Sequence, residues 1–166
     1  MVRPISADYP SHVAHKARSR CVCRRCKREF ELRRALHIHS AKAHGERTNT
    51  AMCAEADTLF RGYIRERDKT CQMASAECWG ELEAAHFVGR TRKSVRWHPD
   101  NACLLCEEHH RRLDTDSIGK HSFFAARLGE ERFTALHMKS QQAFDRDYDR
   151  VIRELRVLKH SLGEGA

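Results

Sequence analysis

The chain has 166 residues, and its 31 basic against 23 acidic side chains give a formal net charge of +8. Residues 1–50 contain 12 basic and 4 acidic side chains, whereas residues 51–166 contain 19 of each, so the whole excess lies in the first third. A concentrated positive segment of this kind is typical of nucleic-acid binding. No apolar run approaches the ~20 residues that span a bilayer, and no secretory leader is recognisable, so we expect no membrane association.

The first residues, 1–19, combine prolines, serines and basic side chains without apolar periodicity, and we expect them to form a disordered basic tail. The chain contains eight cysteines and 12 histidines, and most of them lie in two blocks. In a reducing compartment, cysteines beside histidines indicate metal ligation and not disulfides. Metal binding would also compensate for a small core, because only 7% of the residues are aromatic.

The first block, at 20–48, contains Cys23, Cys26, His39 and His44 in the spacing C-x2-C-x12-H-x4-H. The two thiolates of such a turn and two histidines near a helix end can complete a tetrahedron around Zn²⁺. The segment resembles a two-cysteine two-histidine zinc finger with a ββα fold. We therefore expect one structural zinc ion here, whose binding would supply most of the folding free energy of so small a module.

The finger helix carries apolar residues at the three positions that usually address bases, namely Leu32, Ala35 and Ile38. None of them can make a bidentate hydrogen bond to a base edge. The finger is nevertheless strongly basic, so we expect contacts to the phosphate backbone with little sequence preference, or contact with a protein through the apolar face. The residues predicted to bind nucleic acid in this block are Arg24, Arg25, Lys27, Arg28, Arg33 and Arg34.

Residues 49–70 have apolar side chains at helical spacing and are predicted to form a helix that connects the two metal blocks. The second block, 71–120, contains two strand-like segments at 82–88 and 102–105 with a basic loop between them. A second four-ligand zinc site is predicted at Cys71, Cys78, Cys106 and His109. Residues 121–166 are predicted to be helical, and their long apolar stripe either packs on the core or forms a homodimer contact.

The order of His86, Asn101 and His110 around these strands resembles the HNH endonucleases, whose ββα-metal motif is commonly braced by a cysteine knuckle. The pieces RERDKTC, AAHFVGR, VRWHPDNACLLC and FFAARLGEERFTAL are similar to phage recombination nucleases of the NinG type, and the resemblance covers residues 59–137. The resemblance implies an α+β fold in which a small zinc-stabilised HNH core follows the finger and precedes a long C-terminal helix.

The resemblance also implies roles for individual residues. His86 would be the general base, since a neutral imidazole has a pKa near operating pH. Asn101 would hold the loop that orients this imidazole, and His110 would bind one catalytic Mg²⁺ or Mn²⁺ at the scissile phosphate. Arg90 is the candidate for contact with the reacting phosphate. The basic loop residues that would hold the DNA backbone are Arg92, Lys93 and Arg96.

The chain departs from the HNH pattern immediately before the expected base. Many members of the family place Asp or His there as a metal ligand, but this chain has Ala85. Asp114, four residues after His110, or Glu83, on the same strand face as Ala85, are the substitutes that the sequence offers.

We therefore expect a metal-dependent DNA endonuclease that acts on phage recombination or branched DNA intermediates in the cytoplasm of a bacterium or phage-infected host cell. The alternative is a catalytically inactive double-zinc protein that binds nucleic acid or serves as an adaptor, and Ala85 favours it. RNA remains open as the substrate, because the finger and the basic loop would accept either backbone.

Overall fold

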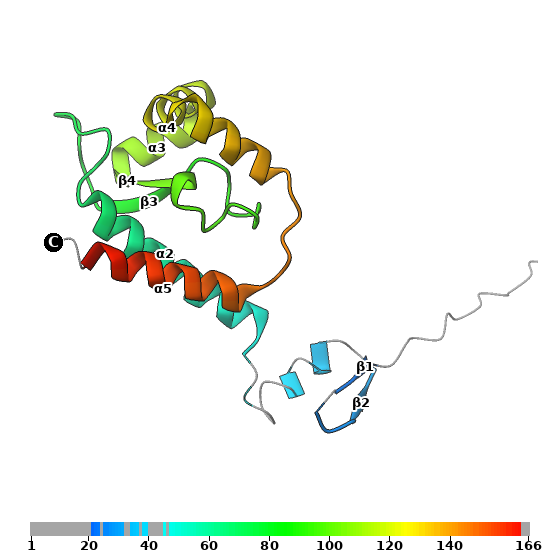
Figure 1. Cartoon of the computed structure of the whole chain (residues 1–166). Coiled ribbons are helices and arrows are strands. Elements are labelled where there is room, and N and C mark those ends of the chain that lie inside the picture. Colours follow the sequence, from blue (N-terminus) through cyan, green and yellow to red (C-terminus); the bar gives the residue numbers. More distant parts are fainter. Residues whose placement is uncertain are drawn as a thin grey trace, which may run out of the picture. The chain divides into compact units, whose positions relative to one another are not determined.

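The computed structural model describes residues 21–23, 25–31, 34–36, 38–39, 45 and 47–163 (Figure 1). The tail expected at 1–19 lies outside these residues. The chain divides into two compact units, with the boundary between Thr48 and Asn49. Both units mix helices with a small antiparallel sheet, so the fold class is α+β. No helix among the described residues has the length and apolarity needed to cross a membrane.

The first unit contains a short hairpin followed by helical residues. Strands β1 (Cys21–Val22) and β2 (Glu29–Phe30) pair antiparallel, with Cys21 opposite Phe30. The turn between them is closed by hydrogen bonds from Cys23 N to Arg28 O (2.8 Å) and from Lys27 N to Cys23 O (2.9 Å). Residues 34–36 and 38–39 are helical.

The second unit is built around one two-stranded sheet. Strands β3 (Leu82–His86) and β4 (Ala102–Cys106) pair antiparallel, with Ala85 opposite Cys103 and His86 opposite Ala102. Helices α2 (Asn49–Asp68) and α5 (Tyr148–Gly163) lie side by side on one face (Figure 1). Helices α3 (Glu107–Thr115) and α4 (Ser117–Ser140) lie on the other face (Figure 1).

Burial of β4 on both faces explains this layered arrangement. All five residues of β4 are buried, which is the pattern of a strand covered on two sides. On one face Ala102 and Leu104 pack in a cluster with Phe60 and Ile64 of α2. On the other face Cys103 and Leu105 join a cluster that includes Leu113 of α3 and Phe124 of α4.

The apolar stripe of the C-terminal helix is used inside the chain. Tyr148, Ile152 and Leu155 of α5 are buried in the same cluster as Phe60 of α2. Because α5 follows α2 along its length, the stripe covers the core. The large apolar side chain that α5 leaves exposed is Val157.

The domain boundary predicted at 120/121 falls inside helix α4. Helix α4 begins at Ser117 because Asp116 caps it, accepting a hydrogen bond from Gly119 N at 2.8 Å. Gly119 therefore lies in the first turn of α4. The break in this helix falls at Gly129, whose φ of 75° is the left-handed conformation that glycine tolerates.

A buried ion-pair network joins the end of α2 to the start of β4. The Asp68 side chain is 3% exposed and accepts from Arg67 Nε at 2.6 Å, from Leu104 N at 2.8 Å and from Arg127 at 3.1 Å. Arg67 also donates to the carbonyl oxygens of Pro99 and Ala102, at 2.8 and 2.9 Å. The network therefore fixes where the chain enters β4.

We expect Asp68→Ala to lower the free energy of unfolding by about 3 kcal/mol, because it leaves the half-buried Arg67 and the Leu104 N–H without their shared carboxylate. Urea denaturation measures this loss. Burial alone would raise the pKa of Asp68, but its hydrogen bonds with Arg67 and Leu104 N lower it overall. The carboxylate thus contributes stability above about pH 4, and the contribution is lost as pH falls through the lowered pKa.

Exposed Glu131 on α4 provides the matched control. Glu131→Ala removes the same type of charge and is expected to change the free energy of unfolding by at most about 0.5 kcal/mol. Equal effects of the two substitutions would contradict a stabilising role of the Asp68 network.

Candidate metal centres and active-site cleft

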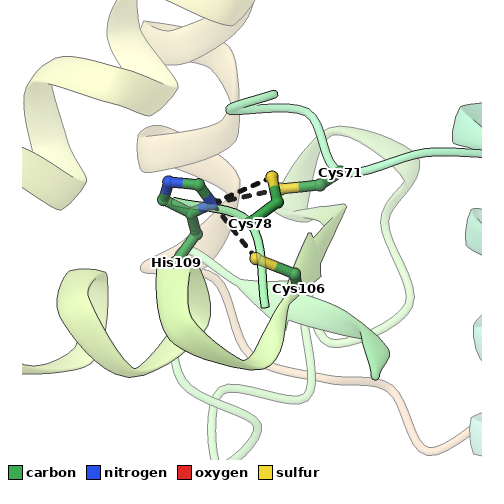
Figure 2. Close-up of side chains that lie close together, drawn as sticks. All are labelled: Cys71, Cys78, Cys106 and His109. Atoms are coloured by element: carbon green, nitrogen blue, oxygen red, sulfur yellow. Dashed lines mark hydrogen bonds between the residues drawn. The ribbon is translucent and has the colours of Figure 1, made fainter. Parts of the chain in front are cut away.

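The second unit brings its four predicted zinc ligands together. Cys71 follows α2, Cys78 lies in the loop before β3, Cys106 ends β4, and His109 lies in the first turn of α3. Their ligand atoms all lie within 4.8 Å of one another. Figure 2 shows the three sulfur atoms around one nitrogen of the His109 ring. The sulfur atoms of Cys106, Cys71 and Cys78 are 3.1, 3.4 and 3.6 Å from His109 Nδ1.

These separations fit a tetrahedral zinc ion. Zinc-ligand bonds of about 2.0–2.3 Å place neighbouring ligand atoms about 3.5–3.8 Å apart across a tetrahedron. Nδ1 of His109 faces the sulfurs, while its Nε2 is 3.2 Å from Ser75 Oγ. A hydroxyl can accept the Nε2 hydrogen and leave the Nδ1 lone pair for a metal. The cluster could therefore hold zinc, with Ser75 orienting the histidine.

Local backbone groups favour the thiolate at Cys106. Burial alone would raise the pKa of this thiol, but the backbone N–H groups of His109 and Trp79 and the His109 ring outweigh it and lower the pKa to about 6. Since the thiolate is the form that binds metal, the end of β4 is preorganised for a cation.

The first unit contains the second cluster. The ligand atoms of Cys23, Cys26 and His39 lie within 4.8 Å of one another, with Cys26 Sγ 3.1 Å from His39 Nε2. The backbone N–H of Cys26 is the main cause that lowers the pKa of Cys23 to about 6. These three residues could hold zinc, and the predicted fourth ligand, His44, lies outside the described residues.

The basic residues predicted to bind nucleic acid in the first unit are placed only in part. Four of them are exposed, and they are Arg25, Lys27, Arg28 and Arg34. Arg24 and Arg33 lie outside the described residues, as does Leu32. Of the three positions that usually address bases, the structure describes two: Ala35 is half-buried and Ile38 is exposed. The exposed side chains therefore include both cations and an apolar contact.

A cleft of about 840 Å³ runs along β3 between α2 and α3. It is lined by four acidic residues, Asp57, Glu81, Glu83 and Asp114, and by four basic residues, Arg61, Arg65, Arg90 and Lys120. The predicted base His86 and the predicted metal ligand His110 both line it. The cleft thus combines imidazoles with carboxylates that can bind a hard cation and with cations that can bind a phosphate.

His86 is the last residue of β3 and is half-buried against α2. Its ring lies 5.5 Å from the Phe60 ring, and its Nε2 is 3.0 Å from the carbonyl oxygen of Arg96. Because a carbonyl only accepts, Nε2 carries the hydrogen and Nδ1 keeps the lone pair that a base needs. Burial lowers the pKa of His86 more than the Arg96 carbonyl raises it, and the charge of Arg90 lowers it further. The imidazole is therefore neutral at neutral pH.

Asn101 is fully buried at the end of the 3-10 turn η1 (Pro99–Asn101). Its side chain accepts from Val88 N at 2.8 Å and donates to Val88 O at 3.0 Å. Its own carbonyl accepts from Phe87 N at 2.8 Å. Asn101 therefore holds the two residues that follow His86, and its effect on catalysis stays a prediction.

His110 on α3 lies between two carboxylates. Its Nδ1 is 2.7 Å from Glu83 of β3, and its Nε2 is 3.4 Å from Asp114 one turn further along α3. Lys120 in turn pairs with Asp114 at 2.7 Å. Glu83 and Asp114, the two residues proposed from the sequence to replace the metal ligand missing at position 85, thus both contact His110.

The structure gives a reason for Ala85. Side chains alternate along β3, and Ala85, 1% exposed, points into the apolar cluster that contains Cys103 and Phe124. A carboxylate at this position would be buried without a partner, at a cost of several kcal/mol. Glu83, two residues earlier on the same face, is exposed and reaches the cleft instead.

The basic loop between the strands is tied to α2 through Asp57. This carboxylate accepts from Arg96 at 2.6 Å, Arg90 at 2.8 Å and Trp97 Nε1 at 2.8 Å. The Arg96 side chain is only 15% exposed, so it supports the loop from within. Arg90 is 55% exposed and can exchange Asp57 for a phosphate. Arg92 is exposed, and Lys93 donates to the Tyr148 hydroxyl at 2.7 Å.

Sequence reasoning missed the contribution of α2 to this site. Asp57, Arg61 and Arg65 line the cleft from a helix that was interpreted only as a connector. Their apolar neighbours give the helical periodicity, but no local pattern tells which polar residue of a helix faces a distant strand. Ser75 was missed for the same reason, since its partner His109 is 34 positions away.

Comparisons of the chain with models of known families, with curated proteins and with solved structures found no match.

Proposed function

We propose that this chain is a metal-dependent endonuclease of the HNH type that hydrolyses phosphodiester bonds in DNA. The observation that supports it best is the cleft beside β3, which joins His86 at a strand end to His110 on the following helix, with cations and carboxylates around them. Phosphodiester hydrolysis needs these groups: a base for water, oxygen and nitrogen ligands for a divalent cation, and positive charge at the phosphate.

In this proposal each residue of the cleft has one task. His86 accepts the proton of the attacking water through Nδ1, and Asn101 fixes the backbone beside it. Arg90 leaves Asp57 to contact the phosphate. His110 and Glu83, with Asp114 nearby, would hold one Mg²⁺ or Mn²⁺. When bound, this cation would supply charge stabilisation at the phosphate and at the leaving oxygen.

The two cysteine-histidine clusters hold structural zinc in this proposal. Cys71, Cys78, Cys106 and His109 join the loop before β3 to the start of α3, which keeps Glu83 and His110 in place. The finger supplies backbone contacts that are insensitive to sequence, through the exposed residues Arg25, Lys27, Arg28 and Arg34. The resemblance to phage recombination nucleases makes branched or single-stranded DNA the first substrate to test, with RNA next.

One observation favours a protein that binds nucleic acid without cutting it. Among the described residues, the two groups of three or more ligands that could hold a metal are the zinc clusters, and neither contains His86 or His110. Instead, His110 is engaged by Glu83 at 2.7 Å. A double-zinc adaptor would keep this pair closed, whereas an enzyme must open it to admit a cation.

The test is a cleavage assay on supercoiled plasmid, single strands and a four-way junction, with Mg²⁺, with Mn²⁺ or with no added divalent cation, and without chelators so that the zinc clusters stay intact. We expect cleavage that requires the divalent metal, and His110→Ala is expected to reduce it on the order of 10²-fold or more while raising the Mn²⁺ concentration for half-maximal rate. Exposed His137 on α4 gives the control, and His137→Ala should cleave as wild type. A wild-type protein inert on every substrate would favour the adaptor.

A further inference from the structure

A second cavity, of about 490 Å³, lies between the basic loop and the linker that joins α4 to α5. We call it the linker pocket. Its lining residues are Asn49, Thr91, Arg92, Lys93, Ser94, Gln142, Phe144, Arg146 and Tyr148. All of them belong to the second unit. Polar hydrogen-bond donors and cations thus line the linker pocket together with two aromatic rings.

The charge of the linker pocket is entirely positive. Arg92, Lys93 and Arg146 line it, and no acidic residue of the described part of the chain does. By contrast, the cleft beside β3 balances four acids against four bases. A concave site with three cations and no carboxylate would repel a metal ion and attract an anion.

The aspartates on either side of Arg146 are engaged elsewhere. Asp145 pairs with Arg150 at 2.6 Å, and Asp147 accepts from Arg150 N at 2.9 Å in the first turn of α5. Arg146 itself has a φ of 63°, the left-handed conformation that is unfavourable for a residue with a side chain. In the described residues neither Arg146 nor Arg92 has an ion-pair partner.

The two walls of the linker pocket are joined by a direct contact. Lys93 donates to the Tyr148 hydroxyl at 2.7 Å and lies 5.4 Å from the centre of its ring. Tyr148 packs edge-on against Phe144 and Trp97, at 5.2 and 5.9 Å between ring centres. Tyr148 is buried and Phe144 is half-buried, so the cations are the groups of the linker pocket that can bind an anion.

The linker pocket and the cleft are lined by consecutive residues. Arg90 lines the cleft, and Thr91, the next residue, lines the linker pocket. Along the same loop, Arg92 and Lys93 continue the positive charge into it. A polyanion that reaches Arg90 would therefore meet the linker pocket next.

We propose that the linker pocket binds a backbone phosphate of the same nucleic-acid strand that occupies the cleft, with Arg92, Lys93 and Arg146 as its ligands. This inference rests on the proposed function for the identity of the strand. The phosphate contacted there lies outside the scissile position, so the linker pocket positions the substrate and takes no part in the chemical step. Because a backbone phosphate carries no base information, binding should be indifferent to base sequence.

The test is fluorescence anisotropy of a labelled oligonucleotide with the full chain across a salt series, with EDTA absent so that the zinc clusters stay intact. Arg92→Gln with Arg146→Gln is expected to weaken binding on the order of tenfold and to reduce the slope of log affinity against log salt by about two. Exposed Arg153 on α5 lies outside the linker pocket, and Arg153→Gln should leave both quantities unchanged. Thermal melts of each variant exclude loss of the fold.

The outcomes separate this inference from the proposed function. If the double variant binds the oligonucleotide more weakly and the wild-type protein cleaves no substrate, the linker pocket is supported and the proposed nuclease function is refuted. Cleavage by wild type together with unchanged binding by the double variant would overturn the linker pocket alone. The last outcome concerns competition against the labelled oligonucleotide. If inorganic phosphate displaced it as well as an unlabelled oligonucleotide at the same total phosphate concentration, the linker pocket would be a small-molecule phosphate site and the inference would be overturned.

Discussion

Cys106→Ala is expected to unfold the second unit at room temperature, or to leave it as a loosely packed state. Cys106 is 2% exposed and its sulfur is 3.1 Å from His109 Nδ1 in the cluster that could hold zinc. Structural zinc contributes about 10–16 kcal/mol of apparent binding free energy in small modules, which is as large as the whole stability of an ordinary domain. Circular dichroism and zinc content by mass spectrometry measure the result, with two ions expected per wild-type chain and one per variant.

Cys103 provides the matched control for this substitution. It is fully buried three residues earlier on the same strand, and burial raises its pKa to about 12, so it stays a neutral thiol. Cys103→Ala should keep both zinc ions and cost only about 1 kcal/mol of packing. A Cys106→Ala protein that folds normally with two zinc ions would refute the assignment of this cluster.

His86→Ala is expected to lower the rate of phosphodiester cleavage by about 10²–10⁴-fold, the usual contribution of a general base. Binding of the oligonucleotide should be unchanged, because His86 is half-buried and its Nε2 hydrogen is directed to the Arg96 carbonyl. Single-turnover cleavage measures the loss, and the His137→Ala variant again serves as control. Added imidazole should restore part of the activity, since it can replace the missing base.

The pH profile of wild type tests the same assignment. Burial and the charge of Arg90 lower the pKa of His86 below its ordinary value near 6.5. The protonated ring cannot accept a proton, so cleavage should fall as pH drops through this lowered pKa, at a pH below about 6.5. Arg90→Gln removes a positive charge and should move the acid limb to higher pH. His86 would be refuted as the general base if the His86→Ala variant kept the same acid limb, or if it cleaved as fast as wild type.

Residue spacing was enough to predict the Cys/His clusters that could hold zinc, because zinc ligation requires a recognisable spacing of cysteines and histidines. Cys106 and His109 are three residues apart at a strand-to-helix junction, so they converge by local geometry. The structure then brings Cys71 and Cys78 to them from the loop before β3. Spacing also predicted that His109, and not its neighbour His110, joins the cysteines. In the structure His109 lies with the cysteines, and His110 lines the cleft.

The polar residues that organise the cleft could be found only in the tertiary structure. Asp57 holds Arg90, Arg96 and Trp97 from a helix more than 30 residues away in sequence. Likewise, the burial of Ala85 and the contact of Glu83 with His110 depend on which face of β3 is covered by α3 and α4. Sequence periodicity gives the two faces of a strand, but not the element that covers each of them.

The sequence by itself therefore determined the two Cys/His blocks that could hold metal, the strands and helices around them, and the concentration of charge in the first third. The tertiary structure decided which side chains share a cavity, and so which of the loop cations are engaged by Asp57 and which line the linker pocket. The physical reason is the separation of the residues along the chain. The Cys-x2-Cys and Cys-x2-His spacings and helical periodicity are local patterns, whereas ion pairs and burial depend on packing between distant elements.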